Sequence, residues 1–224
     1  MLRVGTLLCC LALLAAGCGE DDEAAGTPTP TPTRTAAPQA GCETAEAPEP
    51  KPEEERPKPD ERLERGKTYV ATVTTSCGEF EITLDPRDAP VTGGSFKSLA
   101  DDGFYEGTSF HRIVPGFVIQ GGDPLGTGEG GPGYSVVEAP PDDLKYEKGV
   151  VAMAKTDVEE AGTSGSQFFV VTAEDAQLPP QYALLGRVTA GQDVVDRISV
   201  VETDPATDAP VDPVVIESIR VEES

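Results

Sequence analysis

One arginine stands in an unusually apolar part of the sequence. Residues 109–123 read SFHRIVPGFVIQGGD, so Arg112 is embedded among large apolar side chains and is soon followed by Phe117 and Gln120. A cation in such a run stays largely exposed unless it is paired. Residues 165–169, GSQFF, repeat the combination of an amide with aromatic rings. We expect these stretches to line one apolar groove that holds a single guanidinium and two amide side chains.

The residues that bond-making chemistry requires are scarce around this groove. His111 is the only histidine of the chain, so a metal site with several histidine ligands is excluded. A hydrolytic triad would have to be built around this one residue, which we interpret as structural. No nucleophile, general base or metal-ligand set accompanies Arg112. The sequence therefore favours binding, or catalysis through binding alone, and we expect neither a metal nor another cofactor.

The charge balance excludes a further class of partner. Forty Asp and Glu residues against 17 Lys and Arg residues give a formal net charge of -23. Nucleic-acid binding needs a basic stripe that contacts phosphates, and such a stripe is missing. We therefore expect no nucleic-acid partner. We also expect a monomer, because a large net charge suppresses self-association.

The elements that must position the groove are mostly short strands. Residues 68–84, TYVATVTTSCGEFEITL, form two β-rich runs, and the second alternates apolar and polar residues with the period of a strand. Further apolar runs that fit strands cover 113–119, 150–154, 168–172, 183–188 and 214–221. Short helices are predicted at 91–101 and 192–198, although Gly93 and Gly94 weaken the first by roughly 1 kcal/mol each relative to alanine. This pattern predicts a mostly β domain, either a barrel or a sandwich.

The chain divides into three segments of different composition. Residues 1–18 contain an apolar run with the length of a secretory signal core, which is short for a membrane-spanning helix. Residues 19–65 are rich in Pro and Glu, and Leu63 is their only large aliphatic residue. Such a stretch buries too little apolar area to offset its ordering entropy, so we predict a disordered tether. Residues 66–224 are long enough for a complete core and form the predicted folded domain.

The end of the first segment suggests how the protein is anchored. Residues 15–18, AAGC, resemble the processing motif of bacterial lipoproteins, in which the cysteine, here Cys18, carries the lipid. The alternative is an ordinary secretory signal that is cut nearby. We expect a lipid-anchored protein on the extracytoplasmic side of the cell membrane. Whether it faces a periplasm or the outer cell surface stays open.

The cysteines outside the lipid site suggest a cross-link. Cys9 and Cys10 lie in the signal run and are removed with it, and Cys18 is the predicted lipidation site, which leaves Cys42 and Cys77. Two remaining thiols in an exported chain favour a disulfide. Closing this loop would stabilise the fold by roughly 3–4 kcal/mol in the chain-entropy model. Two free thiols, with Cys77 as a small core residue, are the alternative.

Four blocks of the domain resemble the cyclophilin family of peptidyl-prolyl cis-trans isomerases. In chain order they read FHRIVPGFVIQGGDP, GVVAMAK, GTSGSQFFVVT and LLGRVTAGQDVVDRI, and the first is close to the family signature. The resemblance covers roughly residues 68–221. It implies an eight-stranded antiparallel barrel capped by two helices, and proline-containing polypeptides as partners.

The resemblance also implies a role for individual positions. The catalytic arginine of the family falls on Arg112. The positions that would contact the substrate are Phe117, Val118, Gln120, Ala154, Lys155, Gln167, Phe169, Leu178 and Tyr182.

The implied function is accelerated X-Pro isomerisation in exported proteins, with Arg112 stabilising the twisted amide. Lys155, Gln177 and Tyr182 replace the family's usual asparagine, tryptophan and histidine. These replacements keep an alternative open, in which the domain is a cyclophilin-fold module that binds peptides with little turnover.

Overall fold

The computed structural model describes residues 41–52 and 54–224, which belong to the compact unit Ala36–Ser224. The predicted signal segment 1–18, its Cys18 and the first part of the predicted tether lie outside the described residues. Within the described part, no helix combines the length and the apolar character needed to cross a membrane.

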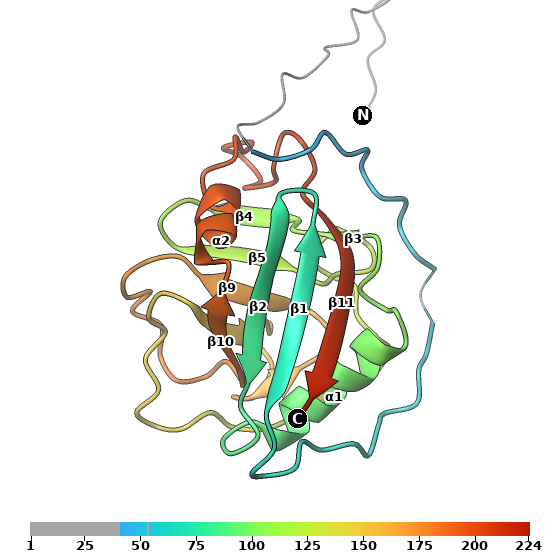
Figure 1. The fold of residues 1–224 in the computed structure, drawn as a ribbon, viewed down its shortest axis with the longest axis vertical. Coiled ribbons are helices and arrows are strands. Elements are labelled where there is room, and N and C mark those ends of the chain that lie inside the picture. Colours follow the sequence, from blue (N-terminus) through green and yellow to red (C-terminus); the bar gives the residue numbers. More distant parts are fainter. Residues whose placement is uncertain (1–40, 53) are drawn as a thin grey trace, which may run out of the picture. The chain divides into compact units, whose positions relative to one another are not determined.

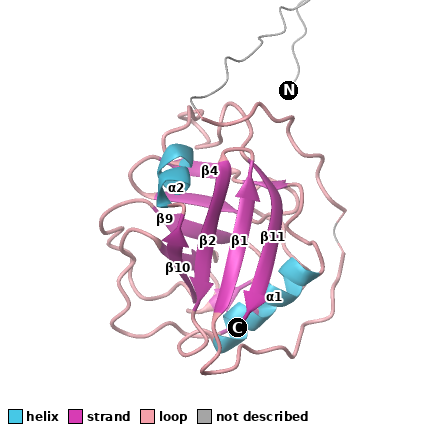
Figure 2. Cartoon of the chain, viewed as in Figure 1, coloured by secondary structure: helices cyan, strands magenta, loops and turns pink. Residues whose placement is uncertain are grey.

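An antiparallel sheet of nine strands forms most of the described chain (Figures 1 and 2). In spatial order its strands are β3 (Thr108–Ser109), β11 (Val215–Glu223), β1 (Tyr69–Thr75), β2 (Gly78–Leu84), β10 (Leu184–Ala190), β7 (Val150–Met153), β9 (Phe168–Val171), β5 (Val118–Gly121) and β4 (Arg112–Val114). Figure 1 shows β4, β5 and β9 crossing behind the long strands β1 and β2. A bridge between Ser109 and Asp123 joins β3 to the residues after β5, so the sheet curls round towards its own far edge.

The strand count agrees with the implied eight-stranded fold once β3 is set apart. This edge strand has only two residues, and the other eight strands of the sheet have three or more. A separate pair of two-residue strands, β6 (Val136–Val137) and β8 (Thr163–Ser164), lies outside the main sheet.

One predicted strand was wrong. The apolar run 113–119 is a hairpin, in which β4 and β5 are joined by a turn at Pro115 and Gly116. The turn is closed by a hydrogen bond from the Phe117 N–H to the Val114 carbonyl, 3.0 Å. Gly116 has a φ of +71°, a conformation that glycine adopts without strain. Apolar content alone could not show this reversal, because both strands of the hairpin are apolar.

Both predicted helices are confirmed. Helix α1 spans Pro90–Asp101 and helix α2 spans Gln192–Ile198. Pro90 occupies the first turn of α1, where its missing N–H costs no helical hydrogen bond. Helix α1 contributes Phe96 and Leu99 to the barrel core, and α2 contributes apolar residues to the same core.

The C-terminal part of the predicted tether differs from a free chain. Residues 41–52 and 54–65, called the strap below, run along one side of the domain to the start of β1 (Figure 1). Cys42 forms a disulfide with Cys77, as predicted. Leu63 is only 4% exposed and belongs to the barrel core. A single buried leucine, a cross-link and backbone hydrogen bonds therefore order a stretch whose composition is that of a tether.

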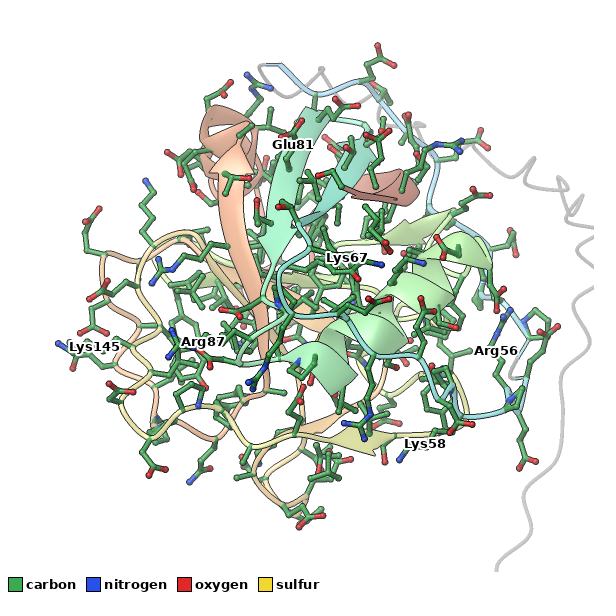
Figure 3. All side chains as sticks on the ribbon, turned by 60° about the horizontal axis from the view of Figure 1, so that its bottom comes forward. Arg56, Lys58, Lys67, Glu81, Arg87 and Lys145 are labelled. Carbon is green, nitrogen blue, oxygen red and sulfur yellow. A yellow bond between two sulfur atoms is a disulfide. The ribbon has the colours of Figure 1, made fainter. Side chains whose placement is uncertain are left out.

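The two glycines of α1 are explained by the strap. A Cβ atom on Gly93 would overlap the side chain of Leu63, and one on Gly94 would overlap the carbonyl oxygen of Glu61. The helix thus gives up intrinsic propensity so that the strap can lie directly against its backbone. Earlier in the strap, Arg56 forms an ion pair with Asp102, just after α1. Figure 3 labels Arg56 on the strap.

Candidate active site

Strand pairing places the predicted catalytic arginine in one row with an amide and an aromatic ring. Arg112 on β4 pairs with Gln120 on β5, which pairs with Phe169 on β9, and Phe169 pairs with Ala152 on β7. Directly paired residues of antiparallel strands project from the same face of a sheet. The guanidinium, the amide and the ring therefore share one face. Phe168, the residue before Phe169, belongs to the barrel core.

The face beside Arg112 is apolar. Val118 and Phe169 are 3% and 4% exposed and belong to a second apolar cluster, separate from the barrel core. Phe117, Leu178 and Tyr182 pack against this cluster while remaining partly accessible. The structure thus brings together five of the residues predicted to contact the substrate.

Tyr182, another predicted contact, is held in place through its backbone. The hydroxyl of Tyr146 donates to the carbonyl of Tyr182 at 2.6 Å and accepts from its N–H at 3.0 Å. Burial raises the pKa of Tyr146 to about 12, so this hydroxyl keeps its proton at any physiological pH. The Tyr182 ring stands edge-on to Phe169, with ring centres 5.5 Å apart. Tyr182 is therefore anchored through its backbone and packs its ring against the apolar cluster.

Lys155 is another of the three substituted positions and lies in the loop that follows β7. Its ammonium group donates to the carbonyls of Thr156 and Glu159 at 2.9 and 3.1 Å, and lies 5.7 Å from the centre of the Tyr182 ring. Gln177, the third, is exposed and has a φ of +54°.

The two predicted glutamines form a chain of hydrogen bonds. Gln120 donates to Gln167 at 3.0 Å, and Gln167 donates to the carbonyls of Gly128 and Gly130, both at 2.9 Å. Both glutamines line an open groove of about 720 Å³ that also includes Ala154. The glutamine pair therefore connects the Arg112 row to residues 124–132, called the glycine-rich loop below.

The glycine-rich loop is itself held at both ends by the strap. The Lys51 N–H donates to the carbonyl of Pro124 at 2.9 Å, and the Arg56 N–H donates to that of Pro132 at 3.2 Å. The buried carboxylate of Asp123, just before the loop, accepts the N–H groups of Leu125 and Thr127 inside it. The strap therefore contacts the segment that supports the glutamine pair.

Arg112 itself has a partner that sequence reasoning missed. Its side chain is 38% exposed, and its Nε lies 3.3 Å from a carboxylate oxygen of Asp208. Gln120, predicted to contact the substrate, stands opposite Arg112 on β5 and donates an amide hydrogen to Gln167. No sequence signal singled out Asp208, because it is one of several acids in a polar loop far along the chain.

The arrangement offers a guanidinium and two amides beside an apolar surface. Among the described residues, no group of three or more His, Cys, Asp and Glu side chains is placed to hold a metal ion. Such a site can bind a peptide through apolar contacts and through hydrogen bonds from the guanidinium and the amides.

The sequence of the domain also matches a known protein family. Residues 69–221 match the model of the cyclophilin-type peptidyl-prolyl cis-trans isomerase family. The chain belongs to the cyclophilin family.

Individual cyclophilins agree with this assignment. Peptidyl-prolyl cis-trans isomerase B of Streptomyces anulatus is 41% identical over 170 residues, which are 68% of this chain and 95% of that protein. Peptidyl-prolyl cis-trans isomerase A of Mycobacterium tuberculosis is 39% identical over 172 residues, 69% of this chain and 92% of that protein. A cyclophilin of Cryptosporidium parvum, crystallised in the presence of the dipeptide Ala-Pro, superposes with a TM-score of 0.63 at 31% identity, over 68% of this chain and 98% of that one. The chain is thus a cyclophilin-type peptidyl-prolyl cis-trans isomerase, an enzyme with the predicted mostly β fold.

Proposed function

We propose that this cyclophilin accelerates X-Pro isomerisation in exported polypeptides, and that Arg112 does so by stabilising the twisted amide. The observation that carries the proposal is the row of Arg112, Gln120 and Phe169, which places a cation beside an apolar surface. A proline ring on that surface would bring its nitrogen within reach of the guanidinium.

The free energies fit catalysis by binding. Rotation about an amide bond is opposed by about 18–20 kcal/mol of resonance, whereas the two X-Pro isomers differ by only about 1 kcal/mol. An enzyme therefore needs only to bind the twisted state more tightly than either planar state. A differential binding of about 5–7 kcal/mol corresponds to an acceleration of roughly 10⁴–10⁵.

Arginine suits this role for a physical reason. In the twisted state the prolyl nitrogen becomes pyramidal and gains a lone pair, which can accept a hydrogen bond that the planar amide does not offer. The guanidinium stays charged and presents its donors in a fixed plane, unlike a flexible lysine ammonium.

The test is the turnover of an Ala-Pro peptide by the full chain and by Arg112→Ala. We expect the variant to lose at least about tenfold in kcat/KM, because its transition-state hydrogen bond is gone. Arg112→Lys, which keeps the charge but not the fork, should also be impaired. Near-full turnover by Arg112→Ala with an unchanged melting temperature would refute the assignment.

We propose further that Cys18 carries a lipid that holds this enzyme, as a monomer, on the extracytoplasmic side of the membrane. The sequence AAGC and the preceding apolar run support this, and the Cys42–Cys77 disulfide is typical of an oxidising compartment. Labelled fatty acid should enter the full chain expressed in a bacterium, and Cys18→Ala should abolish the label. Cys10→Ala, which changes a cysteine of the signal run, serves as the matched control. Equal labelling of both variants would refute lipidation at Cys18.

A further inference from the structure

A tight loop approaches the edge of the sheet at Arg112. The ends of residues 202–211, called the 202–211 loop below, are joined by a hydrogen bond from the Val211 N–H to the Glu202 carbonyl at 2.8 Å. Inside it the Asp204 N–H donates to the Ala209 carbonyl, also at 2.8 Å. The loop therefore has a defined shape, although its sequence is polar and contains two prolines.

Asp208 lies inside this loop, and its backbone contacts β4. Its N–H donates to the Asp204 carbonyl and its own carbonyl accepts from the Ile113 N–H, both at 2.8 Å. Its φ is +59°, one of two positive values among the described residues other than glycine. Asp and Asn tolerate this conformation better than most residues. The backbone of Asp208 is thus fixed to the residue that follows Arg112.

This contact places the Asp208 carboxylate beside Nε of Arg112. The Oδ2 atom of Asp208 lies 3.3 Å from Nε of Arg112. Guanidinium has five N–H donors, one on Nε and four on the two terminal nitrogens. The ion pair is therefore with Nε rather than with one of the two terminal nitrogens.

The ion pair is too accessible to contribute much to folding. The two side chains are 38% and 42% exposed, and ion pairs this exposed contribute little to the stability of a fold. A long side chain on an edge strand has many rotamers, however, and the pair restricts them. Its effect is therefore expected on the placement of the guanidinium rather than on the stability of the fold.

We propose that Asp208 is a positioning residue, which holds the Arg112 guanidinium in the orientation needed for isomerisation. The proposal rests on the catalytic role proposed above for Arg112. Asp208 need not touch the substrate, because it acts through Nε of the arginine.

The test compares Asp208→Asn and Asp208→Gly in the full chain. Both replacements tolerate a positive φ, so the loop backbone is kept, whereas alanine would add strain at this position. We expect kcat to fall about three- to tenfold, more in the glycine variant, because displacement of a catalytic group lowers the rate of the chemical step. KM for an Ala-Pro peptide and the melting temperature should change little. Glu202→Gln removes one negative charge from an exposed position of the same loop and should leave all three quantities unchanged.

A double-variant comparison separates this proposal from the role of Arg112. If Asp208 acts through Arg112, Asp208→Asn should cause no further loss in an Arg112→Ala background. An active Arg112→Ala would overturn the catalytic role of the arginine itself. An inactive Arg112→Ala together with wild-type kcat in both Asp208 variants would overturn only the positioning role. A loss that persists in the Arg112→Ala background, or one that Glu202→Gln reproduces, would also overturn it.

Discussion

Phe168 and Phe169 are adjacent in β9 and serve two different regions of the molecule. Phe168 is fully buried in the barrel, where Phe96, Tyr105 and Phe110 surround it at ring-centre distances of 5.7 to 6.0 Å. Phe169, on the opposite face of the strand, packs on Tyr146 and Tyr182.

The difference shows how one short strand builds both a core and a site. On the inner face, the partners of β9 are all apolar and the rings pack from several directions. On the outer face, the row through Phe169 continues into Gln120 and Arg112, so apolar packing ends beside a polar edge. Leu63 and Cys42 of the strap pack with the barrel core, so this part of the strap belongs to the inner region. Changes to the inner region and the strap should therefore lower stability, and changes to the outer row should lower turnover.

The sharpest test of this comparison is the pair Phe168→Ala and Phe169→Ala. Phe168→Ala should lower the free energy of unfolding by about 3–5 kcal/mol, because it leaves a cavity in a closed core. Phe169→Ala should cost less stability, because the outer face can relax towards solvent, but should lower kcat/KM about tenfold through loss of the proline surface. Denaturant unfolding and peptide turnover measure the two effects. Equal losses of stability with unchanged turnover in both variants would erase the distinction.

Cys42→Ser tests whether the strap acts on the inner region through the disulfide. Loss of the disulfide between Cys42 and Cys77, which are 35 positions apart, should lower the free energy of unfolding by about 3–4 kcal/mol. Most of the turnover should remain at temperatures where the domain is folded. Reduction of the wild-type chain is the matched measurement and should give the same loss. An unchanged denaturation midpoint would show that the cross-link does not constrain the unfolded chain.

Gly94→Ala tests the contact between the strap and α1. Alanine is the better helix former by about 1 kcal/mol, so an isolated helix would gain stability. Here the new methyl group would overlap the Glu61 carbonyl, and we expect a net loss of about 1–2 kcal/mol in unfolding experiments. Ser98→Ala, in the same helix, controls for the general effect of alanine. A Gly94→Ala variant more stable than the wild type would contradict the contact with the strap.

The smallest expected effect is a pH dependence from His111. Its burial lowers its pKa below the ordinary value of 6.5, with Asp123 opposing and Arg112 reinforcing the shift. The folded state therefore favours neutral histidine. Its contribution to stability is fully present above about pH 6.5 and is lost as the pH falls through that value towards the lowered pKa.

His111→Gln should remove this contribution, so its stability should vary less with pH in that range than that of the wild type. Because His111 is the only histidine, the difference between the two unfolding profiles reports this residue directly. Two parallel profiles would show that the histidine titrates alike in the folded and unfolded chains.

Much of the fold and of the site could be predicted from local sequence. Helices α1 and α2 follow from short amphipathic patterns, and the Cys42–Cys77 disulfide follows from elimination among five cysteines. The apolar pattern over 113–119 predicts one strand where the structure has the hairpin of β4 and β5, because both arms of the hairpin are apolar.

The sequence by itself determined the family, the position of Arg112 and the set of apolar residues near it, because these lie in short contiguous motifs. Only the tertiary structure decided that Asp208 faces Arg112, that the strap orders on the domain, and why α1 contains two glycines. Each of these contacts joins segments that are distant in the chain. Hydrophobic periodicity and turn signals describe neighbouring residues, so contacts set by the packing of distant polar segments leave no local pattern.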